Sequence, residues 1–211
     1  MTLPIPNHGD NDPLSRPRAF VLLKSGRSLD LLNSDPQAWT DEDLAAGLAR
    51  TLRRGGSSKW EHSLSVAQHI LTVLALRELD GWLPAGERLR EVLRDATEFM
   101  LGWDCISPLK PRSARPSERS RPACRAAVDA RYRLPPWTDE TYPRHKLADR
   151  LAAACEAFHV VGWSRTDMIE ALDFVIAPLT TDPLCAPRGF APWEPWPPKW
   201  RKPASSSASG N

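Results

Sequence analysis

The sequence lacks any apolar run near the 18 residues that a membrane-spanning helix needs, so we predict no membrane span. Residues 1–18 have neither an apolar core nor a cleavage pattern, and we expect no secretory signal peptide. The 4 cysteines lie 19, 31 and 30 residues apart without a CxxC pair, which excludes a zinc finger. Together these absences predict a cytoplasmic protein whose thiols are free.

The chain also has little net charge. Its 28 Lys and Arg and 26 Asp and Glu give a formal charge of +2, which neither requires nor excludes a nucleic-acid partner. One basic cluster comprises Arg112, Arg115, Arg119, Arg121 and Arg125. Glu118 dilutes this cluster, so we interpret it as a solvated loop and do not expect nucleic-acid binding.

What is present fits one globular domain with tails. The 211 residues are 41% hydrophobic and 26% charged, with 21 prolines and 11 glycines. Residues 1–18 are polar and Pro-rich, and we expect them to be flexible. The domain is predicted to span 19–185. In 186–211, the Trp/Pro-rich part is predicted to be an extended strap packed on the domain, before a disordered Ser-rich end.

Apolar residues recur at helical spacing in every long segment between the tails, which predicts an all-α bundle. We expect helices near 40–54, 60–79, 85–102, 122–132, 139–160 and 165–177. Prolines predict a loop over 104–121. Strand signal is confined to 19–23, where the sequence allows a short hairpin.

Three of these predicted helices carry ligand-type side chains inside apolar surroundings. The segments are Val66–Leu71, Val92–Phe99 and His145–Leu151. One such side chain alone is usually structural. Three in this order, with a Pro-Leu-Lys sequence at 108–110, indicate a shared site.

These segments resemble the HD-domain metal-dependent phosphohydrolases, nearest the 5′-deoxynucleotidase-like and phage- or plasmid-borne branch. The matching motifs are the SVAQH of Ser65–His69, the LHDAxE pattern at Leu93–Glu98, LGD…PLK across 101–110, and AD…E from Ala148 to Glu156. Upstream, 25–36 and 53–56 are similar to the branch's SGR…PDP and R.GG segments. The resemblance spans roughly residues 20–175 and implies an HD-domain-like helical bundle.

In that family two histidines and two aspartates hold one divalent cation, which polarises a phosphate and activates water. The resemblance implies that His69, Asp95 and Asp149 are ligands and that Asp95 and Glu98 take part in the chemistry, with Glu98 as acid–base candidate. The implied phosphate contacts are Arg53, Arg54, Lys110 and, less directly matched, Arg27.

The sequence departs from the family where the HD histidine should stand, because that residue is Arg94. Arginine has only donors and stays protonated, so it cannot ligate a cation. Another histidine could fill the gap: His62, two helical turns before His69 on nearly the same face but about 10 Å away along the axis, or His145, one turn before Asp149.

Two further interpretations remain open: three ligands hold a metal weakly, or Arg94 replaces the metal. For the second, we predict a charge-assisted bond from Arg94 to Asp149, Asp95 or Glu98.

The resemblance thus implies a phosphohydrolase acting on a nucleotide or related phosphate ester. Its cofactor would be Mn, Co, Ni, Fe, Zn or Mg, or no metal if Arg94 replaces it, and a homodimer is one expected form. The alternative is a catalytically degenerate HD-domain protein that binds a nucleotide or a protein partner without hydrolysis.

Overall fold

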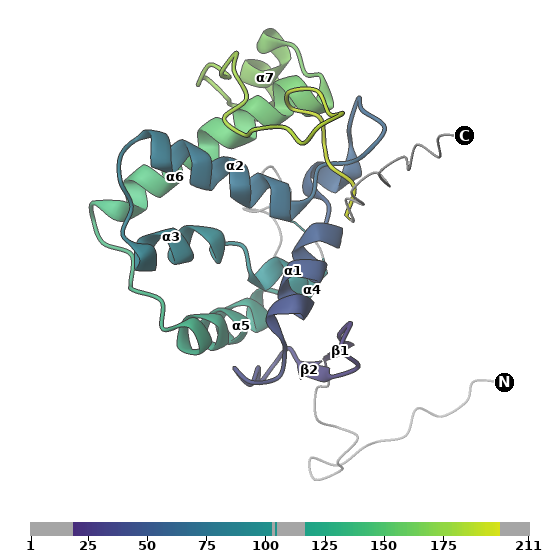
Figure 1. Cartoon of the computed structure of the whole chain (residues 1–211), viewed down its shortest axis with the longest axis vertical. Helices are drawn as coiled ribbons and strands as arrows, with labels where there is room; N and C mark the ends of the chain where they lie inside the picture. The colour runs from purple at the N-terminus through teal and green to yellow at the C-terminus, as the bar shows by residue number, and fades with distance from the viewer. Residues whose placement is uncertain (1–18, 103, 105–116, 199–211) are drawn as a thin grey trace, which may run out of the picture.

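The computed structural model describes residues 19–102, 104 and 117–198, and most of its regular structure is helical (Figure 1). The elements are β1 (Phe20–Leu22), β2 (Ser28–Asp30), α1 (Asp41–Arg50), η1 (Arg53–Gly56), α2 (Val66–Leu79), α3 (Ala85–Val92), α4 (Thr97–Leu101), α5 (Ser117–Tyr132), α6 (Thr141–Cys155), η3 (Glu156–Val161) and α7 (Arg165–Leu172). The predicted all-α class is confirmed. The predicted N-terminal hairpin is also present, with Val21 opposite Leu29 in an antiparallel pair.

Local sequence signals explain where the first helices begin. Thr40 caps α1 in a capping box with Asp43, whose carboxylate also accepts from the backbone N–H of Ser25 in the hairpin. Ser65 caps α2 by accepting from the backbone of Gln68. Each cap satisfies backbone donors that the first turn of a helix leaves free.

The main core lies between the hairpin and helices α1, α2, α4 and α5. Trp39 is fully buried, and its ring meets that of Phe99 edge-on at 6.2 Å. Gly47 lets α1 approach α4 closely, since a Cβ at that position would lie 2.7 Å from Phe99 Cβ. Helix α2 packs along α6 in a second, smaller cluster that includes Val73 and Ala152.

The helix expected over 85–102 is instead two helices, α3 and α4, joined by a turn at 93–96. Backbone N–H groups here donate three residues back, from Ala96 to Leu93 O at 3.2 Å and from Glu98 to Asp95 O at 2.9 Å. Arg125 of α5 donates to Leu93 O at 2.9 Å and to Arg94 O at 2.6 Å. The side chain of Arg125 thus satisfies carbonyls that a continuous helix would have used itself.

Other boundaries also differ from expectation. Helix α2 begins at Val66 rather than near residue 60, because the chain first forms an isolated bridge between Leu52 and Ser65. Helix α5 begins at Ser117, inside the segment expected to be a loop, and includes Pro122.

The segment 186–198 packs on the domain. The side-chain amide of Gln68 donates to Glu194 O at 3.1 Å and accepts from Trp196 N at 2.8 Å. Trp193 is buried, and its ring stacks on His159 with centroids 4.6 Å apart. Trp200 and the Ser-rich end, like residues 1–18, lie outside the described residues. Of the helices that the structure describes, none has the length and apolarity to span a membrane.

Candidate functional site

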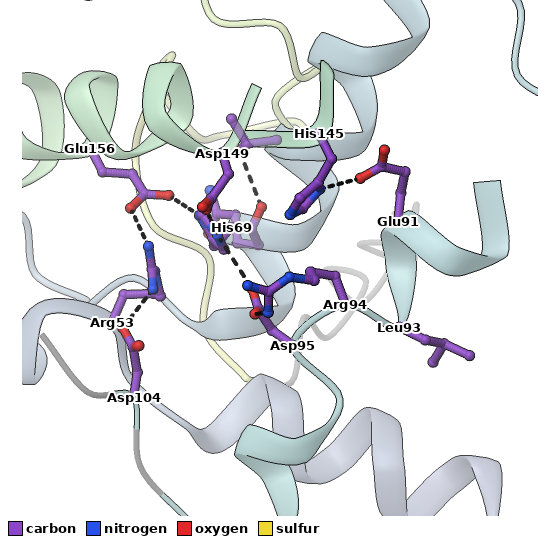
Figure 2. Close-up of polar contacts among 12 residues, drawn as sticks. Arg53, His69, Glu91, Leu93, Arg94, Asp95, Asp104, His145, Asp149 and Glu156 are labelled. Carbon is purple, nitrogen blue, oxygen red and sulfur yellow. Dashed lines mark hydrogen bonds and ion pairs between the residues drawn. The ribbon is translucent and has the colours of Figure 1, made fainter. Parts of the chain in front are cut away.

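The three ligand candidates from separate parts of the chain converge on one point (Figure 2). His69 Nε2 on α2 lies 3.5 Å from Asp95 Oδ2 in the 93–96 turn and 3.4 Å from Asp149 Oδ1 on α6. His69 is 1% exposed, so this meeting point is inside the bundle. The structure therefore brings together the residues that the sequence singles out.

A buried ion network contacts His69 on the Nδ1 side of its ring. His69 Nδ1 is 2.5 Å from Glu156 Oε1, and the other oxygen of Glu156 is 3.4 Å from Arg53 Nη2. Arg53 Nη1 in turn donates to Asp104 Oδ2 at 2.6 Å. Although burial would raise the pKa of Glu156, the charges of His69 and Arg53 lower it to about 2. Glu156 is thus an ionised acceptor that fixes the imidazole and leaves Nε2 directed toward the two aspartates.

Each aspartate is held in the same way, by one oxygen. Arg94 Nη1 donates to Asp95 Oδ1 at 2.8 Å, and Lys146 Nζ donates to Asp149 Oδ2 at 2.9 Å. The remaining oxygen of each carboxylate faces His69. The predicted bond from Arg94 to an acidic neighbour is therefore present, and the neighbour is Asp95.

The electrostatics of the cluster keep its members charged. Burial and the Arg53 charge would lower the pKa of His69, but the three surrounding carboxylates raise it well above its usual range. Burial would raise the pKa values of Asp95 and Asp149, yet their bonds with His69 and with the nearby cations hold them well below the usual range. Without a metal, the cluster is an imidazolium between two carboxylates.

Glu98 is in a different state. It is buried at the start of α4, and its Oε2 has no hydrogen-bond partner among the described residues. Burial, followed by the negative charges of Asp95 and Asp104, raises the pKa of Glu98 to about 8. Its carboxyl group is therefore protonated near neutral pH.

The two histidine substitutes differ. His62 lies in a bend before α2, not on the helix, so the expectation that it shares a helical face with His69 is wrong. His145 is buried on α6, one turn before Asp149, and its Nδ1 is 2.6 Å from Glu91 Oε2.

The predicted phosphate contacts are mostly engaged elsewhere. Arg53 is buried in its two ion pairs, and Arg54 donates to Ala153 O at 2.6 Å and lies over the ring of Phe174. Arg27 is exposed on the hairpin and donates to Gln37 O at 3.2 Å. Lys110 lies outside the described residues.

Four residues of the site network were not predicted as site residues: Glu91, Asp104, Lys146 and Glu156. Two carried a usable signal, since Glu156 follows Asp149 by seven residues, two turns on one face, and Lys146 precedes it by three. Asp104 belongs to the LGD-like motif but was given no role, and Glu91 carried no signal, because its partners come from distant parts of the chain.

The donor chemistry fits a divalent cation, although the resting side chains do not form a finished cage. As they stand in the described ranges, no group of three or more His, Cys, Asp or Glu side chains is arranged to hold a metal ion. The spacing is nonetheless suitable, because two ligands about 2.1 Å from one tetrahedral ion lie about 3.4 Å apart. A metal would have to displace the proton from His69 Nε2 and draw in the free oxygens of Asp95 and Asp149.

Comparison with known proteins gives a relationship without an activity. No family model matches the chain. The chain is 36% identical over 155 residues to an uncharacterized protein of Rhodobacter capsulatus, an alignment that covers 71% of this chain and 77% of that protein. The chain belongs to the family of that protein. Because that relative is itself uncharacterized, the relationship assigns no activity to this chain.

Proposed function

We propose that the chain is an HD-type metal-dependent phosphohydrolase that acts on a nucleotide or a related phosphate ester. The observation that carries this proposal is the convergence of His69, Asp95 and Asp149 from three separate elements, with distances of 3.4 and 3.5 Å at the shared nitrogen. In each of these three residues, one polar atom is bound by a neighbouring side chain and a second polar atom faces the shared point. A purely structural ion cluster does not require this arrangement.

The side chains divide the work of phosphate-ester hydrolysis. His69, Asp95 and Asp149 would hold the cation, which would supply charge stabilisation and activation of water. Arg94 and Lys146 carry the cationic heads at the rim, with side chains 32% and 38% exposed, and can reach phosphate oxygens.

Glu98 is suited to proton transfer. Because burial and negative neighbours raise its pKa to about 8, its carboxyl group carries a proton at neutral pH. Oε2 has no partner among the described residues, so this oxygen can give its proton to a leaving-group oxygen.

The ion pair between Arg94 and Asp95 favours a second candidate, a degenerate HD-domain protein that binds a nucleotide or a partner without hydrolysis. A fixed guanidinium at Asp95 supplies positive charge without a metal. In that protein His69, Asp95 and Asp149 would be a structural ion cluster that binds an anion at its rim.

The two candidates separate in one experiment. Metal content is measured in purified protein, and a panel of nucleotides is then tested for binding and for release of inorganic phosphate with Mn²⁺, Co²⁺ or Ni²⁺. Asp149→Ala removes a ligand, and the exposed Asp139→Ala is its matched control. Metal-dependent turnover that is abolished by Asp149→Ala but not by Asp139→Ala supports the phosphohydrolase. Nucleotide binding without metal or turnover supports the degenerate protein, and absence of both binding and turnover contradicts both candidates.

A further inference from the structure

Two copies of one three-residue arrangement flank the site. In the first, Arg53 pairs with Glu156, which holds Nδ1 of His69. In the second, Arg77 Nε donates to Glu91 Oε1 at 2.8 Å, and Glu91 Oε2 lies 2.6 Å from Nδ1 of His145. All of these side chains are nearly or fully buried. Each histidine is therefore oriented by a carboxylate that an arginine keeps in place.

The second histidine has an unused nitrogen. Glu91 accepts from Arg77, so its carboxylate is an acceptor for His145 as well, and Nδ1 carries the proton. Nε2 is then the ring nitrogen left to present a lone pair. This atom is buried without a hydrogen-bond partner among the described residues, although buried polar atoms are rarely left so.

The ring is fixed toward the site. His145 precedes Asp149 by four residues on α6, which places both on one face of the helix. Trp137 packs on the imidazole with centroids 4.7 Å apart, and Arg90 lies over Trp137 in turn. In Figure 2 the ring of His145 lies between Glu91 on one side and His69 with Asp149 on the other.

His145 therefore follows the pattern of the three ligand candidates. Each of these has one polar atom held by the protein, by Glu156 for His69, Arg94 for Asp95 and Lys146 for Asp149, and one atom turned inward. A histidine that donates one N–H to a carboxylate while the other nitrogen remains a lone pair is the usual state of a metal-binding histidine.

We propose that His145 Nε2 is the fourth protein ligand of a divalent cation held by His69, Asp95 and Asp149. It would supply the nitrogen donor that Arg94 cannot, while Arg94 keeps its bond to the outer oxygen of Asp95. The inference rests on the metal dependence of the proposed function, but not on hydrolysis.

The test counts imidazole ligands directly. Zn²⁺ or Co²⁺ is titrated into the metal-free protein by calorimetry, and X-ray absorption of the loaded protein gives the number of histidines on the metal. We expect two in the wild type and one in His145→Gln. Loss of a residue that only supports a ligand typically lowers metal affinity about 10–100-fold. The metal affinity of His145→Gln should fall by more than that. His62→Gln, which changes a histidine outside α2, should leave both values unchanged.

Glu91→Gln separates ligation from positioning. It retains an acceptor for Nδ1, so two histidines should remain on the metal while affinity falls about 10–100-fold. One histidine on the metal in the wild type, no metal bound, or unchanged affinity in folded His145→Gln would each overturn the inference. The wild-type count needs no variant, so a misfolded variant does not obscure the answer. Two bound histidines without any phosphatase activity would contradict only the proposed hydrolysis.

Discussion

Replacing Arg94 with histidine should raise both the metal affinity and the phosphohydrolase activity of the protein. Arg94 Nη1 is 2.8 Å from Asp95 Oδ1, so its charge competes with a cation for that carboxylate. Burial would lower the pKa of Arg94, but the charges of Asp95 and Asp149 raise it, which keeps the guanidinium charged in every usable buffer. The substitution removes this fixed charge. It also introduces an imidazole at the position where the HD-domain family, which this sequence resembles, has one.

Electrostatics gives the order of magnitude of the effect. A guanidinium roughly 5 Å from a divalent ion repels it by about 1.7 kcal/mol even at the dielectric constant of water, and by more inside a protein. Since 1.4 kcal/mol is a factor of ten, relief of this repulsion alone should tighten metal binding by about tenfold or more. A new imidazole donor would add to that gain.

Calorimetric titration of Mn²⁺ or Co²⁺ measures the affinity, and phosphate release from nucleotides measures the activity. Arg94→Gln is the matched control, because it removes the charge without adding a ligand and should show only the electrostatic part. Asp149→Ala introduced into Arg94→His should abolish the gain. Unchanged metal affinity in a folded Arg94→His protein would refute the view that Arg94 limits the site.

Three other substitutions test parts of the network. Glu98→Gln removes the proton donor and should abolish the fall in kcat as pH rises through about 8; a wild-type profile that is flat across pH 7–9 would contradict this role. Glu156→Gln should lower the free energy of unfolding at pH 7 by roughly 3 kcal/mol, because the lowered pKa of Glu156 reflects stabilisation of its ionised form in the folded protein. This difference from the wild type should be lost as pH falls from about 4.5 to 2, and equal urea midpoints at pH 7 would contradict the prediction. Gln68→Ala detaches the strap and should cost about 1–3 kcal/mol in urea denaturation, against little change for the exposed Gln37→Ala.

Local patterns in the sequence predicted the fold class correctly and drew attention to ligand-type side chains in three predicted helices. Helical spacing and caps such as Thr40 locate most helices, because these signals act within one or two turns. The break at 93–96 could not be predicted, because Arg125, which donates to the carbonyls of Leu93 and Arg94, lies 32 and 31 residues away along the chain. That turn sets the direction of Asp95, so one tertiary contact determines a feature of the site.

The partners of the site residues were harder to predict than the residues themselves. His69 and Asp149 stand out as polar side chains in apolar helices, but their companions have no local signature. The resemblance implies, for example, that Arg53 contacts a phosphate. In the structure Arg53 instead lies between Asp104 and Glu156 and forms ion pairs with both carboxylates. A resemblance indicates which residue type stands at a position. Only the folded structure shows which neighbouring group forms an ion pair with it.

The charges around His69 indicate what the site can accept. Among the described residues, the side chains bonded into this cluster comprise four cationic heads and four carboxyl groups. The cations are Arg53, Arg94, Lys146 and protonated His69, and the carboxyl groups are those of Asp95, Asp104, Asp149 and Glu156. A divalent ion that replaces the His69 proton would leave a positive excess of one. Buried excess charge is costly, so under the proposed function a phosphate group at the open rim beside Arg94 and Lys146 would restore the balance.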